Sequence, residues 1–190
     1  MSDANPPPGL AGVVEAAKAA GERGPPPVHL WNPPDCGDID IRIAADGTWF
    51  HEGSPIGREP LVKLFASILR LDPDGYYLVT PVEKMRIRVD DAPFIAVRVD
   101  KAGEALRFLT NVGDVVEAGP GHDLRVTIDP RTDEPRPYVH VRRGLEARLT
   151  RPVFYEIVEW AQPRETAEGL VYAVASQGEW YPVTAPTAKP

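Results

Sequence analysis

The sequence predicts a duplicated α+β fold in which a hairpin–helix–hairpin unit occurs twice. Three observations predict it: apolar and polar residues alternate on either side of tight-turn sequences, each half holds one amphipathic helix, and the order of these elements recurs. The first copy spans about residues 39–89 and the second about residues 138–183, with extra strands between them. Because short turns join most of the strands, we expect mostly antiparallel sheet.

The first copy opens with a hairpin. Residues 38–43 alternate strictly, as in a half-buried strand. Isoleucines occupy one face, and the other face carries Asp38, Asp40 and Arg42. The Asp-Gly pair that follows favours a tight turn, because both residue types tolerate positive φ. The return strand comes next and includes Trp49.

A helix follows this hairpin. Pro60 suits its first turn, where the missing N–H costs nothing, and the sequence Asp-Pro-Asp-Gly at residues 72–75 stops it. A single apolar stripe, at the spacing i, i+3, i+4, i+7 and i+8, is formed by Leu61, Leu64, Phe65, Ile68 and Leu69. We therefore expect the helix to include Leu69 and two strands to follow it, at residues 76–80 and 84–90.

The second half repeats this order of elements. Strands are expected first at residues 94–100, 105–111 and 124–129, and a second hairpin then at residues 138–142 and 145–149. A second amphipathic helix begins at Arg151-Pro152. After a glycine-bearing loop, residues 169–183 follow the pattern of residues 75–89 position for position.

Composition divides the chain into four segments. Residues 1–34 hold 8 of the 22 prolines and one alanine-rich stretch that predicts a short helix. Residues 35–92 form the first α+β repeat, residues 93–185 form the second with its extra strands, and residues 186–190 are a tail.

Charge and cysteine content narrow the classes of protein. The net charge of −7 disfavours binding to nucleic-acid polymers or to anionic membranes, which need a cationic surface. Cys36 is the only cysteine, so we expect no intramolecular disulfide and a reducing, cytoplasmic compartment. The sequence shows neither a signal-peptide pattern nor an apolar run of about 18 residues, so we expect no membrane association. A homo-oligomer is left open.

The densest acidic cluster holds Asp38 and Asp40 on one strand face. Together with Glu83, two such carboxylates can bind a hard cation or serve in acid–base catalysis. The alternative is a ladder of acids and arginines that pairs with neighbouring strands, because Arg42 is next on this face. Cys36 is a nucleophile only beside a base, and a small buried thiol is the plainer interpretation.

Basic residues on the polar strand faces suggest an anion site, because arginine forks match phosphate and carboxylate geometry. The alternative is a sheet face that balances its own acids. Four aromatic residues are candidates to stack on a base, or else belong to the core: Trp49, Trp160, Trp180 and Tyr138. The connection at residues 80–84 either carries function or is a tight turn closed by a Glu–Lys pair. The candidate ligand-binding set is Asp38, Asp40, Arg42, Trp49, Thr80, Glu83, Lys84, Arg86, Tyr138 and Arg142.

Longer motifs carry a resemblance to a known family. They read PDCGDIDIRI at residues 34–43, DGTWF at 46–50, GSPI at 53–56, LVTPVEK at 78–84 and DAPF at 91–94. In these motifs the chain resembles a small proteobacterial family known as domain of unknown function 1285, over roughly residues 31–160. The resemblance implies a duplicated α+β fold, a C-terminal half loosely similar to pleckstrin-homology folds, and a ligand site at the interface between the halves. It also implies a nucleotide-type ligand and a signalling role.

These observations predict a non-enzymatic module that binds or senses a small anionic, nucleotide-like ligand between the two repeats. No catalytic residue, metal ligand or cofactor is assigned. Two alternatives stay open: a metal-dependent enzyme that uses Asp38, Asp40 and Glu83, and a scaffold for protein interactions.

Overall fold

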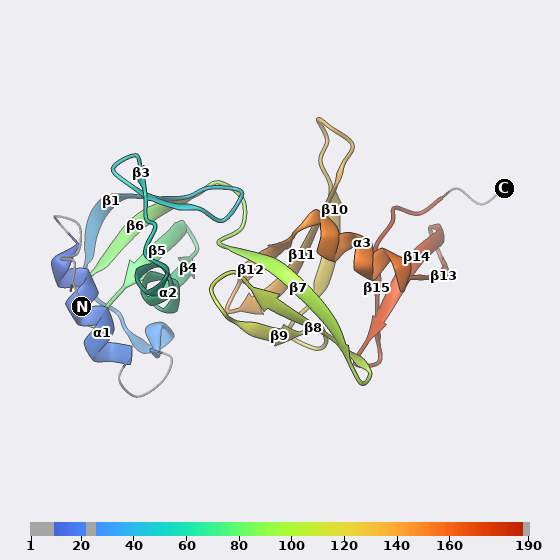
Figure 1. Cartoon of the computed structure of the whole chain (residues 1–190), viewed down its shortest axis with the longest axis horizontal. Coiled ribbons are helices and arrows are strands. Elements are labelled where there is room, and N and C mark those ends of the chain that lie inside the picture. Colours follow the sequence, from blue (N-terminus) through green and yellow to red (C-terminus); the bar gives the residue numbers. More distant parts are fainter. Residues whose placement is uncertain (1–9, 22–25, 188–190) are drawn as a thin grey trace. The chain divides into compact units, whose positions relative to one another are not determined.

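The computed structural model describes residues 10–21 and 26–187. It divides into two compact units, residues 1–91 and residues 92–190. Sheet dominates both, and the predicted α+β architecture with repeated units is confirmed. Figure 1 shows the two units as successive parts of the chain, the first in blue to green and the second in yellow-green to red.

Over its described residues, the first unit contains one mixed sheet and two α-helices (Figure 1). Its sheet has the strand order β3-β2-β1-β6-β5-β4. The elements in chain order are α1 (Ala11–Gly21), the short 3-10 helix η1 (Val28–Leu30), β1 (Asp35–Ile43), β2 (Trp49–His51), β3 (Ser54–Pro55), α2 (Glu59–Ser67), β4 (Leu69–Asp72), β5 (Gly75–Val79) and β6 (Lys84–Val89).

One boundary in this unit differs from the sequence prediction. Helix α2 ends at Ser67, so Leu69 begins β4 and is not helical. The reason is a competing hairpin: residues 69–72 pair antiparallel with β5 across the turn at Pro73-Asp74. Leu69 is buried either way, and the apolar stripe therefore could not show where the helix stops.

Helix α1 belongs to the body of the first unit. It packs against α2, and its apolar side chains Val13, Val14 and Ala17 are buried, as is Leu10 just before the helix. An isolated helix of this length would be marginal in water, so this packing is what holds it.

The second unit contains a six-stranded sheet, a three-stranded sheet and one helix. The strand orders are β10-β11-β12-β7-β8-β9 and β13-β14-β15. The elements in chain order are β7 (Phe94–Ala102), β8 (Ala105–Thr110), β9 (Val115–Glu117), β10 (Leu124–Ile128), β11 (Pro135–Arg142), β12 (Leu145–Leu149), α3 (Arg151–Glu159), β13 (Gln162–Thr166), β14 (Gly169–Ser176) and β15 (Glu179–Pro182). The expected loop after α3 is thus strand β13, whose five residues are all exposed.

The two copies of the repeat close their sheets differently. In the first unit the hairpin strand β1 runs parallel to the last strand β6, so hairpin and meander share one sheet. In the second unit the corresponding hairpin is β11–β12. Its strand β12 runs parallel to β7, which comes before the hairpin in the chain. The meander β13–β15 is then left as a sheet of its own.

A buried serine fastens this separate meander to the larger sheet. Ser176 of β14 is fully buried, and its Oγ accepts a hydrogen bond from the backbone N–H of Leu106 at 2.9 Å. The same Oγ donates to the carbonyl oxygen of Ala118 at 2.6 Å. One side chain therefore satisfies two buried backbone groups of the six-stranded sheet.

We expect Ser176→Ala to lower the free energy of unfolding of the second unit by about 1–3 kcal/mol, because it leaves a buried N–H and a buried carbonyl without partners. Denaturant titration followed by tryptophan fluorescence measures this loss. The control is Ser54→Ala, at an exposed position of β3, which should leave the curve unchanged. Equal effects of the two substitutions would contradict the role of Ser176.

Candidate functional site

The structure places eight of the ten predicted residues in the first unit. They lie on β1, on β2, in the turn at residues 80–83 and on β6. The other two, Tyr138 and Arg142, lie on β11 of the second unit. Pairing of β1 with β6 brings five of the charged residues onto adjacent strands, namely Asp38, Asp40, Arg42, Lys84 and Arg86.

Strand register extends this pairing into a row across four strands. Asp38 of β1 lies opposite Arg86 of β6, and Arg86 lies opposite Tyr77 of β5. Tyr77 in turn lies opposite Arg70 of β4. Residues opposite one another in register share a sheet face. This row therefore places one arginine on each side of Tyr77, Arg86 on β6 and Arg70 on β4.

Tyr77 is the centre of this row. Its side chain is fully buried, and its hydroxyl donates to Asp74 Oδ2 at 2.8 Å and accepts from Arg86 Nη2 at 2.7 Å. The ammonium of Lys84 lies 4.3 Å from the ring centroid, and the guanidinium of Arg86 lies 5.3 Å from it. The ring is therefore held by two cations as well as by packing.

Asp72 neutralises the sheltered side of this arrangement. Its carboxylate accepts from Arg70 Nε at 2.6 Å, from Arg70 Nη2 at 2.9 Å and from Lys84 Nζ at 3.0 Å. The hydrogen bonds from Arg70, with those from Lys84, hold the pKa of Asp72 below its usual value. Arg70 also donates to the carbonyl oxygens of Val28 and Trp31, at 3.0 and 2.8 Å, and so ties η1 to the sheet.

We call the six residues joined in this way the Tyr77 network; they are Arg70, Asp72, Asp74, Tyr77, Lys84 and Arg86. Of these six, only Lys84 and Arg86 belong to the set predicted from the sequence. The other four lie on β4, on β5 and in the turn between them, where the sequence reads as the end of a helix and a mainly apolar strand. The Arg-x-Asp spacing at residues 70–72 was the available signal, since it places both side chains on one face of a strand.

Arg42 lies near the network but has its own partner. Its Nε donates to Asp90 Oδ1 at 3.1 Å and its Nη2 donates to Asp90 Oδ2 at 2.7 Å, and this bidentate pair of hydrogen bonds lowers the pKa of Asp90. Asp40 Oδ1 lies 3.6 Å from Arg88 Nη2, and Asp38 Oδ1 lies 4.0 Å from Arg86 Nε. The arginines on this face of β1 and β6 therefore pair with acids in or next to the same sheet. This agrees with the alternative interpretation of the sequence, in which the sheet face balances its own acids.

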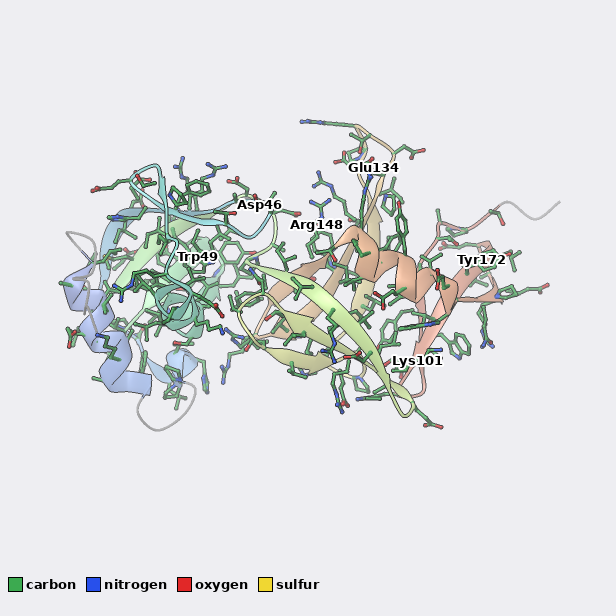
Figure 2. All side chains as sticks on the ribbon, viewed as in Figure 1. Asp46, Trp49, Lys101, Glu134, Arg148 and Tyr172 are labelled. Carbon is green, nitrogen blue, oxygen red and sulfur yellow. The ribbon has the colours of Figure 1, made fainter. Side chains whose placement is uncertain are left out.

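Trp49 and Tyr138 lie in the cores of their units. Trp49 is 1% exposed and its ring stacks on Phe65 of α2, with 6.2 Å between centroids; Figure 2 labels it within the first unit. Tyr138 is 5% exposed, with the guanidinium of Arg125 at 4.3 Å from its ring centroid. Both rings therefore follow the alternative in which the aromatic residues belong to the core. Neither ring is exposed enough to stack on a ligand.

The turn before β6 is closed by Thr80. Its Oγ1 accepts from the backbone N–H of Glu83 at 3.2 Å, and its own backbone N–H donates to the carbonyl of Glu83 at 2.9 Å. Lys84 bonds to Asp72, so a Glu–Lys pair is not what closes the turn. In the second unit, Arg142 pairs with Asp114 and lies 4.8 Å from the ring of Phe94.

In the part of the chain that the structure describes, no group of three or more His, Cys, Asp or Glu side chains is arranged to hold a metal ion. The described helices include none that is long and apolar enough to cross a membrane.

The fold is that of a two-domain protein. The candidate site is the charged face of the mixed sheet in the first domain. The model for the N-terminal domain of the DUF1285 family of unknown function matches residues 26–92, and the model for its C-terminal domain matches residues 93–183. The chain belongs to this family. The predicted resemblance is thereby confirmed.

Two solved structures are similar to this chain. A DUF1285 family protein from Silicibacter pomeroyi DSS-3 is 50% identical, with 90% of this chain and 93% of that chain covered and a TM-score of 0.81. A DUF1285 family protein from Shewanella baltica OS155 is 31% identical, with 63% of this chain and 90% of that chain covered and a TM-score of 0.51. No curated protein matches the sequence.

We expect Asp72→Asn to lower the free energy of unfolding by roughly 1–3 kcal/mol, because it leaves two sheltered cations without their counter-charge. The matched control is Asp100→Asn, which removes the acid of another Arg-x-Asp pair on one strand. Arg98 and Asp100 are 65% and 48% exposed, against 14% and 15% for Arg70 and Asp72, so the control should lose far less. Equal losses in denaturant titration would contradict the account of Asp72.

The same carboxylate predicts a pH dependence. Its folded pKa lies below the unfolded value of about 3.9. Between these two values the unfolded chain binds more protons, so the free energy of unfolding falls as the pH drops from about 4 through the folded pKa. In denaturation measured from pH 5 to pH 2, Asp72→Asn should show a shallower decline than the wild type. Parallel curves would show that Asp72 does not carry this dependence.

Proposed function

We propose that this chain is a non-enzymatic module that binds a small anionic, nucleotide-like ligand at the Tyr77 network. One observation carries the proposal: three cations, Arg70, Lys84 and Arg86, are held around one buried aromatic ring by strand register and hydrogen bonds. Cations fixed in this way lose little side-chain entropy when an anion arrives, which favours binding.

Arg86 is the residue that meets the ligand first. Its side chain is 42% exposed, and its Nη2 hydrogen-bonds to Asp74, which is 57% exposed in the turn between β4 and β5. An exposed surface pair of this kind has little net stability. A phosphate or carboxylate group that replaces Asp74 must also accept the hydrogen bond that the buried Tyr77 hydroxyl donates to Asp74, and it offers the guanidinium fork a bidentate partner.

Lys84 and Arg70 supply charge from the sheltered side. Both remain bonded to Asp72 while Arg86 exchanges its partner, so the ligand does not leave two buried cations unpaired. Only one acid has to move. The site thus selects an anion small enough to reach Arg86 beside the β4–β5 turn, and the signalling role implied by the family resemblance would follow from occupancy of this site.

The test is a thermal-shift screen against ATP, GTP, cyclic dinucleotides and inorganic phosphate. A ligand at 100 times its Kd adds about 2.7 kcal/mol, which raises the melting temperature of a chain this size by several degrees. We expect such a shift with at least one nucleotide in the wild type and its loss in Arg86→Gln, each measured against its own ligand-free melting temperature.

The control is Arg98→Gln, which removes an exposed strand arginine that also pairs with a carboxylate. It should keep the full shift. Absence of any shift at millimolar nucleotide, or an equal shift in all three proteins, would contradict a binding site at the Tyr77 network.

A further inference from the structure

The second unit contains a pocket that the proposed function does not use. Its volume is about 510 Å³, within the range of about 300–1,000 Å³ typical of small-molecule sites. Its walls come from β10, the β13–β14 turn, β14, β15 and the segment after β15, and include Val126, Ile128, Ala167, Val171, Pro182 and Pro186. Figure 1 shows these elements, β10 in ochre and β13–β15 in orange to red.

The segment after β15 is a fixed wall of this pocket. Thr184 Oγ1 accepts a hydrogen bond from the backbone N–H of Tyr172 at 3.0 Å. Three residues later, the backbone N–H of Thr187 donates to the carbonyl of Leu170 at 2.9 Å. The carbonyl oxygen of Thr187 passes so close to Gly169 that a Cβ there would lie 2.2 Å from it. We call residues 183–187 the C-terminal strap.

The chemistry of the walls is apolar. Two of the polar side chains that line the pocket are already bonded to the protein: Thr166 Oγ1 donates to the carbonyl of Gly169, and Thr184 Oγ1 accepts from Tyr172. Among the ten described lining residues the single charged one is Glu168, and none is a lysine or an arginine. An anionic ligand would meet a carboxylate and no counter-charge, whereas an uncharged apolar molecule would bury carbon surface.

Ile128 strengthens this interpretation. It lines the pocket, and 43% of its surface is exposed to solvent. Covering exposed aliphatic surface is favourable, because it removes carbon atoms from water. Val171, which also lines the pocket, is by contrast 3% exposed, so the lining includes a core side chain as well as exposed ones.

We infer that this pocket is a binding site for a small, uncharged, apolar molecule, held between β10 and the C-terminal strap. The site shares no residue with the Tyr77 network, because every residue that lines it belongs to the second unit. The two sites therefore differ in ligand class, anionic in the first unit and apolar in the second.

The test is a fluorescence titration of the full chain with N-phenyl-1-naphthylamine, an uncharged apolar probe. We expect saturable binding with a stoichiometry of one. Ala167→Trp should weaken it at least tenfold, because an indole at this exposed lining position fills the pocket. The control Ala175→Trp places the same group at an exposed alanine of β14 that does not line the pocket, and should leave the affinity unchanged.

A second pair of variants tests the strap. Gly169→Ala forces the strap away, and should also weaken probe binding at least tenfold. Gly75→Ala is its matched control: both glycines begin a meander strand at positive φ, 149° and 133°, but a Cβ at Gly75 meets nothing within 4 Å. Circular dichroism verifies that each variant is folded.

Three results would overturn the inference. The first is wild-type fluorescence that does not saturate. The second is equal affinity in Ala167→Trp and Ala175→Trp. The third is probe binding that appears only when light scattering shows a dimer, which would assign the pocket to an interface between two copies of the chain.

Discussion

The first unit depends on one physical constraint: Tyr77 is fully buried in a row of strand positions that are otherwise charged. A buried hydroxyl needs partners, and the charged neighbours need counter-charges. The structure meets both needs with one network, in which Asp72 pairs with Arg70 and Lys84, and Asp74 pairs with Arg86 and accepts from the Tyr77 hydroxyl.

The duplication explains why the two units share elements and still offer different surfaces. Each carries a hairpin, a helix and a three-stranded meander in the same order. Parallel pairing of β1 with β6 merges these parts into one sheet in the first unit, and so aligns the charges of four strands. In the second unit β7 takes the place beside the hairpin, and Ser176 then holds the separate meander to the larger sheet. The apolar pocket lies where β10 approaches this meander.

The sequence predicted the elements whose side chains alternate or repeat with one period, such as β1, β6 and the amphipathic faces of α2 and α3. It missed β4 because Leu69 satisfies the helical stripe and the strand equally well, and it missed β13 because an edge strand with five exposed residues has no apolar face. Within the site, Lys84 and Arg86 were found from alternation. Tyr77 and Asp72 were not, because their role depends on the register between β4, β5 and β6, which local patterns do not encode.

The most direct measurement is a titration of the isotope-labelled chain with GTP and with inorganic phosphate, followed by backbone amide and arginine side-chain NMR signals. An anion site at the Tyr77 network predicts that the largest shifts occur at Arg86, Tyr77 and the β4–β5 turn, and that they saturate. It also predicts that the guanidinium signal of Arg98 stays unchanged. Shifts that centre elsewhere, or that grow linearly without saturation, would contradict the account.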